Sequence, residues 1–533
     1  MSIKWLCVSY VLTVLLLATS FVHVRMDARY LGGPLFYGSD RSHYVIRLQE
    51  GLLNPFGNTG NGIFSVPKDT QGLQPAGLEQ IGGLLLGWTG WRGTEAMIVL
   101  SVLLGALVVP ILQRLLVRTG IKESSAFVGS FLYFFLFFSP IGRFVHQSWS
   151  FSLTLLSLLL FWRFFEMKSV RRAVIAGIAM GMVPYIYYWS WTFVWSIAAM
   201  LFLLTLVRRE HLRHLWSWFF FWLTLGIVAA PYFWHIISLM GLPVAREAAE
   251  RSSLVLSHGI ESYSRSILTL LLALCGFFTL GRRREAAQFL PVASGCIATF
   301  VVLHQQFLHG NVISFSTHYY PYICLIALLF SATLIAKKQW NALSIGSLLL
   351  CTIFLGAALI DYRDRNPLQL APENFAYQHF KSILPVLDSI PKQVVLTDLE
   401  SVLVIAANTK HDVVFTEHAR HLLIPTTEYA ERYCLTTLLA PNPHVEWIAK
   451  TLVETGRLGR ARQDQLYTER LKITTEACAR VRSAPQEWLH HYGVTLLLWN
   501  EKSHPEWKVD PSLFTLQDKG DGWSTWTLTS LSR

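Results

Sequence analysis

Long apolar runs alternate with short clusters of charge through the first two thirds of the chain, and charged residues become frequent again only after residue 361. A membrane-spanning helix needs roughly 20 predominantly apolar residues. By that criterion the sequence predicts about eleven spans, at 4–23, 96–117, 125–140, 149–165, 173–188, 190–207, 213–237, 265–280, 286–304, 319–336 and 341–360. The first run is too long for a signal-peptide core and no A-x-A site follows it, so we interpret it as a retained helix.

Basic clusters predict the orientation of these spans. With a cytoplasmic N-terminus, five alternate loops on the cytoplasmic side each hold a basic cluster, and the short outside loops are much poorer in Lys and Arg, as the positive-inside rule requires. They contain Arg114, Arg118 and Lys122; Lys168, Arg171 and Arg172; Arg208, Arg209 and Arg213; Arg282, Arg283 and Arg284; and Lys337 and Lys338. The outside face then receives the loops 24–95, 141–148 and 241–264, the segment 305–318 and everything after residue 360.

Composition supports a membrane protein and excludes a nucleic-acid partner. Apolar residues make up 52% of the chain and charged residues 15%, against about 25% charged residues in a soluble protein. The net charge of +11 comes from basic residues beside hydrophobic runs, which is where membrane topology places them.

The predicted fold class is a polytopic α-helical membrane protein with a C-terminal soluble α/β domain. The membrane domain covers 1–360, including a first outside loop with amphipathic helices at 24–95, and the extracytoplasmic domain covers 361–533. The pattern predicts helices through most of 427–490 and strands at 392–398, 493–500 and 523–530, the last an edge strand. Cys434 and Cys478 could pair if this domain faces an oxidising compartment, or could remain free thiols.

The first outside loop carries the leading candidate for chemistry. Asp40, Tyr44 and Arg47 share one face at helical spacing. Asp40 could simply cap the helix, or it could be a carboxylate that deprotonates an acceptor or holds a divalent metal. Asp27 is the second candidate acid, with an interfacial charge as the alternative reading.

Three other outside segments hold candidate binding residues. Arg143 is the single Arg of a very short outside loop, so it could hold a lipid phosphate, with Gln147 adding a donor; snorkelling to the headgroups is the alternative. The segment 185–193 clusters aromatic residues, which could stack on a sugar or wrap an isoprenoid tail or could form an interfacial belt. The polar segment 304–320 contains three His whose spacing fits no metal-ligand pattern. The binding candidates in these last two segments are Tyr188, Trp189, Gln305, Gln306, His318 and Tyr319.

In plan, the chain resembles the GT-C superfamily of polyprenyl-phosphate-dependent glycosyltransferases. The resemblance rests on order: a first span, a long outside loop with the Asp-x-x-x-Tyr segment at Asp40, the aromatic turn YIYYWSWTF, the late QQ…G…HYY segment and an outside α/β domain. It covers essentially the whole chain and is closest to poorly characterised bacterial members. Two signatures are missing: Arg41 stands where protein mannosyltransferases have the second acid of an Asp-Glu pair, and the WWD-type motif of oligosaccharyltransferases is absent.

The resemblance implies a site, a reaction and partners. Asp40 would be the base for the acceptor or a ligand of a divalent metal such as Mg²⁺ or Mn²⁺, and no cofactor is certain. Arg47 and Arg143 would contact the phosphate of a polyprenyl-phosphate-linked sugar donor, and a single displacement would invert the anomeric centre. The acceptor, whether lipid, polysaccharide or protein, is not specified. The resemblance also implies a bacterial inner (cell) membrane.

Two other classes of function fit the same plan. A transporter or flippase of lipid-linked sugars would share the bundle, but transporters usually place charges or helix breaks near the membrane midplane, whereas here nearly all ionisable residues lie at span ends. A non-catalytic membrane scaffold would use the outside domain as its binding module.

Overall fold

In a computed structural model, the protein divides into two compact units. The first contains Met1–His23, Leu100–Ile237 and Leu256–Gln369, and the second contains Val24–Val99, Ser238–Val255 and Leu370–Arg533. Besides the predicted C-terminal domain, the second unit therefore holds most of the predicted first outside loop. The residues that the structure describes are 3–35, 39–56, 77–137, 146–208, 214–252, 254–256, 263–281, 289–309, 311–313, 316–337, 345–352, 356, 375, 377–440, 444–451 and 460–529.

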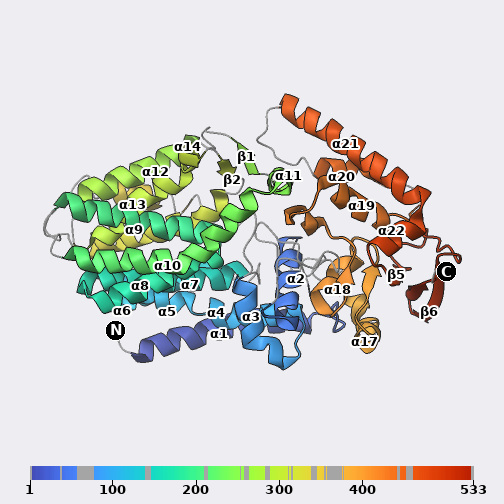
Figure 1. Ribbon diagram of the computed structural model, residues 1–533. Helices are drawn as coiled ribbons and strands as arrows, with labels where there is room; N and C mark the ends of the chain where they lie inside the picture. The colour runs from blue at the N-terminus through green and yellow to red at the C-terminus, as the bar shows by residue number, and fades with distance from the viewer. Residues whose placement is uncertain are drawn as a thin grey trace. The chain divides into compact units, whose positions relative to one another are not determined.

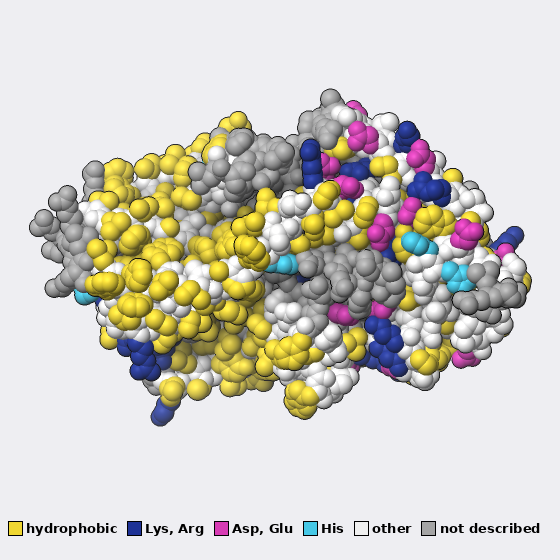
Figure 2. Space-filling view, in the orientation of Figure 1, with side chains coloured by type: hydrophobic (Ala, Val, Ile, Leu, Met, Phe, Trp, Pro, Cys, Tyr) yellow, Lys and Arg dark blue, Asp and Glu magenta, His cyan; other side chains and the backbone are white. Residues whose placement is uncertain are grey.

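The first unit is a bundle of apolar helices. Long helices run side by side in it (Figure 1), and its visible surface is mostly hydrophobic (Figure 2). The longer helices that lie in it or enter it are α1 (Ile3–Met26), α4 (Gly93–Gly105), α5 (Val108–Arg118), α6 (Glu123–Phe137), α7 (His146–Met167), α8 (Val170–Met182), α9 (Tyr188–Arg208), α10 (Leu215–Met240), α12 (Tyr263–Gly276), α13 (Leu290–Leu303) and α15 (Tyr320–Ala336).

Five helical segments among the described residues are long and apolar enough to cross a membrane. They are Ile3–Met26, Gly93–Arg118, Trp149–Met167, Tyr188–Val207 and Leu215–Met240, and shorter apolar helices follow at Tyr263–Thr279, Leu290–Leu303 and Tyr320–Ala336. The chain is an integral membrane protein by this measure. The count of eleven spans stays a prediction, because α6 and α8 are short and much of 341–360 lies outside the described residues.

Helix ends that the charge pattern assigns to the same side lie together in the first unit. Arg118, at the end of α5, pairs with Glu166 at the end of α7. Ser217, near the start of α10, donates to the Lys168 carbonyl at 2.8 Å. The Lys337 ammonium, just after α15, lies 4.3 Å from the centre of the Phe289 ring, just before α13. All three contacts join ends that the sequence places on the basic side.

Short elements connect these helices where the sequence breaks its apolar pattern. Pro184 interrupts the stretch 173–207, because proline cannot donate the backbone hydrogen bond of a continuing helix. Helix α8 therefore ends at Met182, and the next long helix, α9, begins at Tyr188. The other short elements are η2 (Gly87–Thr89), η3 (Val183–Tyr185), β1 (Leu254–Leu256), η5 (Phe277–Gly281), α14 (Gln306–His309), β2 (Asn311–Ile313) and η7 (Ser316–Tyr319).

A mixed five-stranded sheet forms the core of the second unit, in the order β4-β3-β5-β7-β6. Strands β3 (Val394–Leu396), β4 (Asp412–Val413) and β5 (Leu496–Asn500) are parallel, and β6 (Phe514–Gly520) and β7 (Trp523–Leu528) join the β5 side in antiparallel pairs. The three strands predicted from the sequence correspond to β3, β5 and β7. The prediction that 523–530 is an edge strand is wrong: β7 lies between β5 and β6, and the exposed, polar β6 forms the edge.

The unit also contains helices, and three of them come from outside the C-terminal domain in sequence. Most of 427–490 is helical, as predicted. The helices of the unit are α2 (Ser39–Leu53), α3 (Gly77–Leu86), α11 (Pro243–Arg251), η9 (Gln378–Ser382), α17 (Leu384–Ser389), α18 (Ser401–Asn408), η10 (Glu417–His421), α19 (Thr426–Thr436), α20 (Val445–Thr451), α21 (Arg460–Ser483) and α22 (Pro485–His491).

A disulfide joins two of these helices. Cys434 on α19 bonds to Cys478 on α21, across 44 residues of sequence. The sequence left this pairing open. Disulfides persist in oxidising compartments.

Removing this bond is expected to destabilise the second unit. Replacing Cys434 with serine should cost about 2–4 kcal/mol of unfolding free energy, because the unfolded chain regains the entropy of an open loop. The loss should appear as a lower melting temperature of the purified chain and as a changed mobility on non-reducing gels. Cys275→Ser, at a free cysteine, is the control. Equal mobility of wild type and variant without reductant would mean that the bond does not form.

Candidate functional site

Helix α2 brings the first outside loop into the second unit. It packs against α3 and α18. The Gln49 amide donates to the Thr409 carbonyl at 3.2 Å and accepts from the Gly93 N–H at 2.6 Å. Through Gln49, these contacts fix the helix whose first turn carries Asp40. The side chain of Asp40 itself lies outside the described residues.

Two of the residues predicted to share a face with Asp40 are buried on α2. Tyr44 is 8% exposed, and Arg47 donates to Glu79 of α3 at 3.2 Å, with both side chains almost inaccessible. Burial raises the pKa of Glu79, and the positive charge of Arg47 opposes that shift. Glycines at the contact let α2 and α3 lie close enough to bury this ion pair. A Cβ on Gly83 of α3 would lie only 2.0 Å from the carbonyl oxygen of Gly51 on α2.

From the buried ion pair between Arg47 and Glu79 we predict how substitutions change the stability of the second unit. Arg47→Met should destabilise the second unit by about 3–5 kcal/mol, because it leaves the Glu79 carboxyl buried without its cation. Glu79→Gln should cost less, since the amide oxygen still accepts a hydrogen bond. The double replacement Arg47→Met with Glu79→Leu should recover most of the loss. Melting temperatures of the four proteins measure this order; an Arg47→Met protein as stable as wild type would contradict it.

Three histidines meet one turn after Asp40. The centre of the His43 ring on α2 lies 5.2 Å from the ring centre of His418 and 5.4 Å from that of His421, and both of these histidines belong to η10. Burial, and then the charge of Arg420, lower the pKa of His418 to about 3. Burial and several nearby cations hold the pKa of His421 well below its ordinary value. At neutral pH these two imidazoles are therefore uncharged hydrogen-bonding groups.

Arg251 of α11 holds the segment that follows these histidines. Its side chain is fully buried and donates to the carbonyls of Leu422 and Ile424 at 2.9 and 2.7 Å, and to the Thr426 hydroxyl at 2.9 Å. Ser252 also contacts His421, at 3.0 Å. Sequence reasoning missed the histidine cluster, because His43 lies about 375 residues before His418 and His421 in the chain.

The low pKa of His418 predicts acid sensitivity. An unfolded chain protonates this imidazole below about pH 6.5, whereas the folded protein does so only near pH 3. The folded state therefore loses stability as the pH falls below 6.5, by about 2 kcal/mol at pH 5. The melting temperature should fall between pH 7.5 and pH 5, and less steeply in His418→Gln. An identical pH dependence in the variant would contradict this origin.

The remaining acid and the short second loop are placed differently. Asp27 forms a bidentate pair with Arg29, at 2.9 and 2.8 Å, at the surface of the second unit. Arg143 lies outside the described residues, and so does the side chain of Gln147 at the start of α7. The structure therefore gives no geometry for the predicted phosphate contact of Arg143.

In the first unit, the aromatic turn and the late polar segment come together. The rings of Trp189 and His318 stack with their centres 4.4 Å apart, and the Tyr187 hydroxyl lies 2.7 Å from the His318 Nδ1. Gln305 donates to the Tyr319 hydroxyl at 2.7 Å, and the Tyr188 hydroxyl donates to Gln305 at 3.4 Å. We call Tyr187, Tyr188, Trp189, Gln305, His318 and Tyr319 the aromatic cluster. Gln306, which the sequence also predicts to be a binding residue, is buried and directly follows Gln305 in the sequence.

Helix starts position this cluster. Tyr188 and Trp189 begin α9, and Thr192 one turn later lies 2.6 Å from the Tyr319 hydroxyl, which precedes α15. A second contact of this kind joins α9 and α15, because the hydroxyl oxygens of Ser190 and Tyr322 lie 2.6 Å apart. Trp189 is 8% exposed, and no acceptor among the described residues reaches its indole nitrogen. A buried N–H of this kind costs about 1–3 kcal/mol unless a ligand or water accepts from it.

No group of three or more His, Cys, Asp or Glu within the described ranges has the arrangement of a metal site. The side chain of Asp40, the predicted metal ligand, lies outside the described residues, so a role in holding a divalent ion stays a prediction.

Comparison with known proteins identified similar folds only among solved structures. The sequence matches no protein-family model and no curated protein. An oligosaccharyltransferase of Archaeoglobus fulgidus in the apo form is 11% identical over 94% of this chain and 70% of its own, with a TM-score of 0.46. The AglB oligosaccharyltransferase of that organism, in complex with an inhibitory peptide and a dolichol-phosphate, covers the same shares at 11% identity and a TM-score of 0.41. ArnT from Cupriavidus metallidurans, bound to undecaprenyl phosphate, is 11% identical over 96% of this chain and 97% of its own, with a TM-score of 0.42. TM-scores below 0.5 leave the assignment of function to this chain's own residues.

Proposed function

We propose that this chain is a membrane glycosyltransferase of GT-C type, which moves a sugar from a polyprenyl-phosphate-linked donor to an acceptor on the outside of a bacterial cell membrane. The N-terminus is cytoplasmic in this proposal and the second unit is extracytoplasmic. The disulfide between Cys434 and Cys478 supports that side. A site there has no access to nucleotide sugars, so the donor must carry its own activation energy.

The observation that carries the proposal is the aromatic cluster. It combines flat rings with hydroxyl and amide groups at helix ends that the charge pattern assigns to the outside face. Ring faces suit the apolar face of a sugar or an isoprenoid, and the hydroxyls and the Trp189 N–H suit sugar oxygens. The cluster therefore has the chemistry of a subsite for the donor's sugar and first isoprene units.

In the proposed reaction the acceptor hydroxyl attacks the anomeric carbon while the lipid phosphate leaves from the opposite face. Asp40 takes the proton of the attacking hydroxyl, which raises its nucleophilicity at the moment the new bond forms. Arg143 stabilises the negative charge of the departing phosphate. A single displacement of this kind inverts the anomeric configuration.

Arg47 receives a different role from the phosphate contact that the family resemblance implies. Its guanidinium is buried and bonded to Glu79, so the proposal assigns it to fixing α2 and the turn of Asp40. The uncharged His418 and His421 adjoin that turn through His43. They suit an acceptor hydroxyl better than an anion.

Donor consumption tests the proposal. The purified chain in lipid nanodiscs would be mixed with a panel of undecaprenyl-phosphate hexoses and pentoses and with membrane extracts as the acceptor source. We expect one donor to lose its sugar and to leave undecaprenyl phosphate. Nanodiscs expose both leaflets, so a transporter would leave every donor intact, and so would a scaffold. An intact panel would overturn the proposal.

A further inference from the structure

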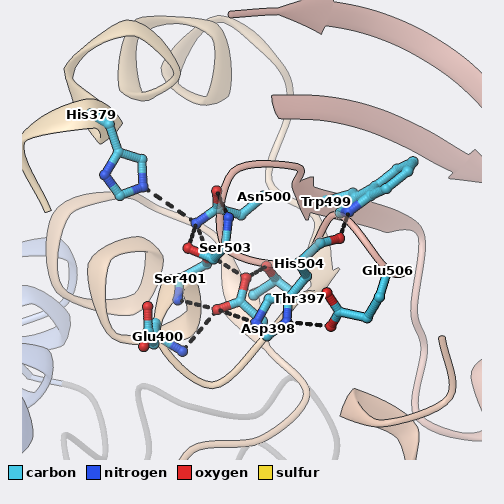
Figure 3. A network of polar contacts seen from close by, with 10 residues as sticks. All are labelled: His379, Thr397, Asp398, Glu400, Ser401, Trp499, Asn500, Ser503, His504 and Glu506. Atoms are coloured by element: carbon cyan, nitrogen blue, oxygen red, sulfur yellow. Dashed lines mark hydrogen bonds and ion pairs between the residues drawn. The ribbon is translucent and has the colours of Figure 1, made fainter. Parts of the chain in front are cut away.

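A polar network lies where two parallel strands of the second unit end (Figure 3). Asp398 comes two residues after β3, and Asn500 is the last residue of β5. The two strands are neighbours in the sheet. The carboxyl ends of parallel strands meet at one edge of a sheet, so both side chains lie at the same edge.

The order of the strands makes this edge a special position. From β3 the chain passes through α18 to β4 on one side, and then returns through η10 and α19–α22 to β5 on the other side of β3. The direction of strand addition therefore reverses between β3 and β5. In open α/β sheets, ligands bind at the carboxyl ends of the strands at such a switch point.

Helix capping accounts for only part of the network. One oxygen of Asp398 accepts the N–H groups of Glu400 and Ser401, at 2.9 and 2.8 Å, which caps α18. The other oxygen accepts the Ser401 hydroxyl. His504 places its Nε2 3.9 Å from the capping oxygen, a contact that the helix does not need.

Asn500 joins the strand end to its surroundings. Its amide nitrogen donates to the Ser503 hydroxyl at 2.9 Å and to the His379 Nε2 at 3.3 Å. Its oxygen accepts the Ser503 N–H at 3.3 Å. Asn500 and Asp398 are 3% and 2% exposed. Burial and hydrogen bonds therefore hold both side chains in place, and they in turn hold the more exposed residues next to them.

Two residues beside this buried pair, His504 and Glu506, reach solvent. The side chain of His504 is 30% exposed and that of Glu506 is 47% exposed, with 3.0 Å between the His504 Nδ1 and the Glu506 carboxylate. Trp507 stacks against His504 with ring centres 4.8 Å apart, and Trp499 donates to the His504 carbonyl at 2.8 Å. The imidazole is thus held by its neighbours while one edge stays accessible.

Charge narrows the class of ligand. The ten residues of Figure 3 include the carboxylates Asp398, Glu400 and Glu506 and contain no Lys or Arg. Such a site disfavours phosphates and other anions. Among the described residues, no group of three or more His, Cys, Asp or Glu could hold a metal ion. Carboxylate acceptors beside imidazole, amide and hydroxyl groups that both donate and accept match the hydroxyls of a neutral sugar.

We propose that this edge of the sheet, formed by Asp398, Asn500, Ser503, His504 and Glu506, binds a neutral saccharide. The site belongs entirely to the second unit and its binding does not depend on the transferase chemistry proposed above. If that chemistry is correct, the saccharide is part of the acceptor. Acceptors that are neutral glycans would then be retained by the second unit during transfer.

Saccharide binding by the purified full chain tests this inference. Neutral and acidic oligosaccharides on an array would identify ligands, and calorimetry with the best neutral one would compare wild type with His504→Ala, Glu506→Gln and the matched control His490→Ala, at an exposed histidine of α22. We expect neutral ligands only, and roughly tenfold or weaker binding in the first two variants. Glu506→Gln keeps the shape of the side chain, so it remains informative if His504→Ala unfolds.

Three results would overturn the inference: no neutral saccharide binds, both site variants bind like wild type, or binding requires a divalent cation. The outcome is separable from the proposed function. Donor consumption without saccharide binding would remove this inference alone. Saccharide binding by a chain that consumes no donor would remove the transferase proposal alone.

Discussion

Asp40→Asn is expected to lower the rate of sugar transfer by roughly 10²- to 10⁴-fold, the usual contribution of a general base. The amide keeps the size and hydrogen-bonding shape of the side chain but cannot accept the proton of the attacking hydroxyl. Donor binding should stay unchanged, because the proposed donor subsite lies on other residues. The measurement is the turnover rate at saturating donor, together with donor affinity.

Asp27→Asn is the matched control for this variant. Asp27 is the second candidate acid of the first outside loop, and its carboxylate already pairs with Arg29. We expect less than about a threefold change in rate, because a solvent-exposed pair contributes little. A slow Asp27→Asn enzyme beside an active Asp40→Asn enzyme would exchange the two assignments.

Trp189→Ala is expected to have the second largest effect, raising the donor concentration needed for half-maximal rate by roughly 10- to 100-fold. The change removes a buried ring from the stack with His318 and the indole N–H that we assign to a sugar oxygen. Loss of an aromatic surface and of one hydrogen bond is worth about 1.5–3 kcal/mol together. The rate at saturating donor should change much less.

Two further variants separate stacking from general damage. Trp189→Phe keeps a ring but removes the N–H, so it should recover part of the affinity. Trp234→Ala removes a tryptophan of the same unit that is 76% exposed, and it should leave the affinity unchanged. Equal affinities of Trp189→Ala and wild type for the donor would mean that the cluster does not bind it.

Much of the architecture followed from local patterns. Apolar runs identified most of the long helices, because burial in lipid demands a nearly uniform composition over about 20 residues. A continuous apolar run identified β5, alternating residues identified β7, and β-branched residues identified β3. β6 was missed because its sequence, FTLQDKG, is exposed and polar. β7 therefore took the place of the edge strand in the prediction.

The candidate site was predictable only where chemistry and local sequence coincide. The aromatic turn and the late polar segment are each conspicuous in sequence, and the structure brings Trp189 and His318 into contact. The burial of Arg47 against Glu79 was not predictable, because the partner comes from a helix 32 residues away. Likewise, the meeting of His43 with His418, and of β3 with β5, depends on the tertiary fold.

The central claim is that a lipid-linked donor supplies both the sugar and the energy for its transfer. The stoichiometry of the reaction in nucleotide-free proteoliposomes tests it most directly, with radiolabelled undecaprenyl-phosphate sugar as the sole sugar source. We expect one undecaprenyl phosphate to be released for each sugar joined to an acceptor, and the release to be lost in Asp40→Asn. Labelled sugar that reaches the opposite leaflet still attached to its lipid would contradict the account.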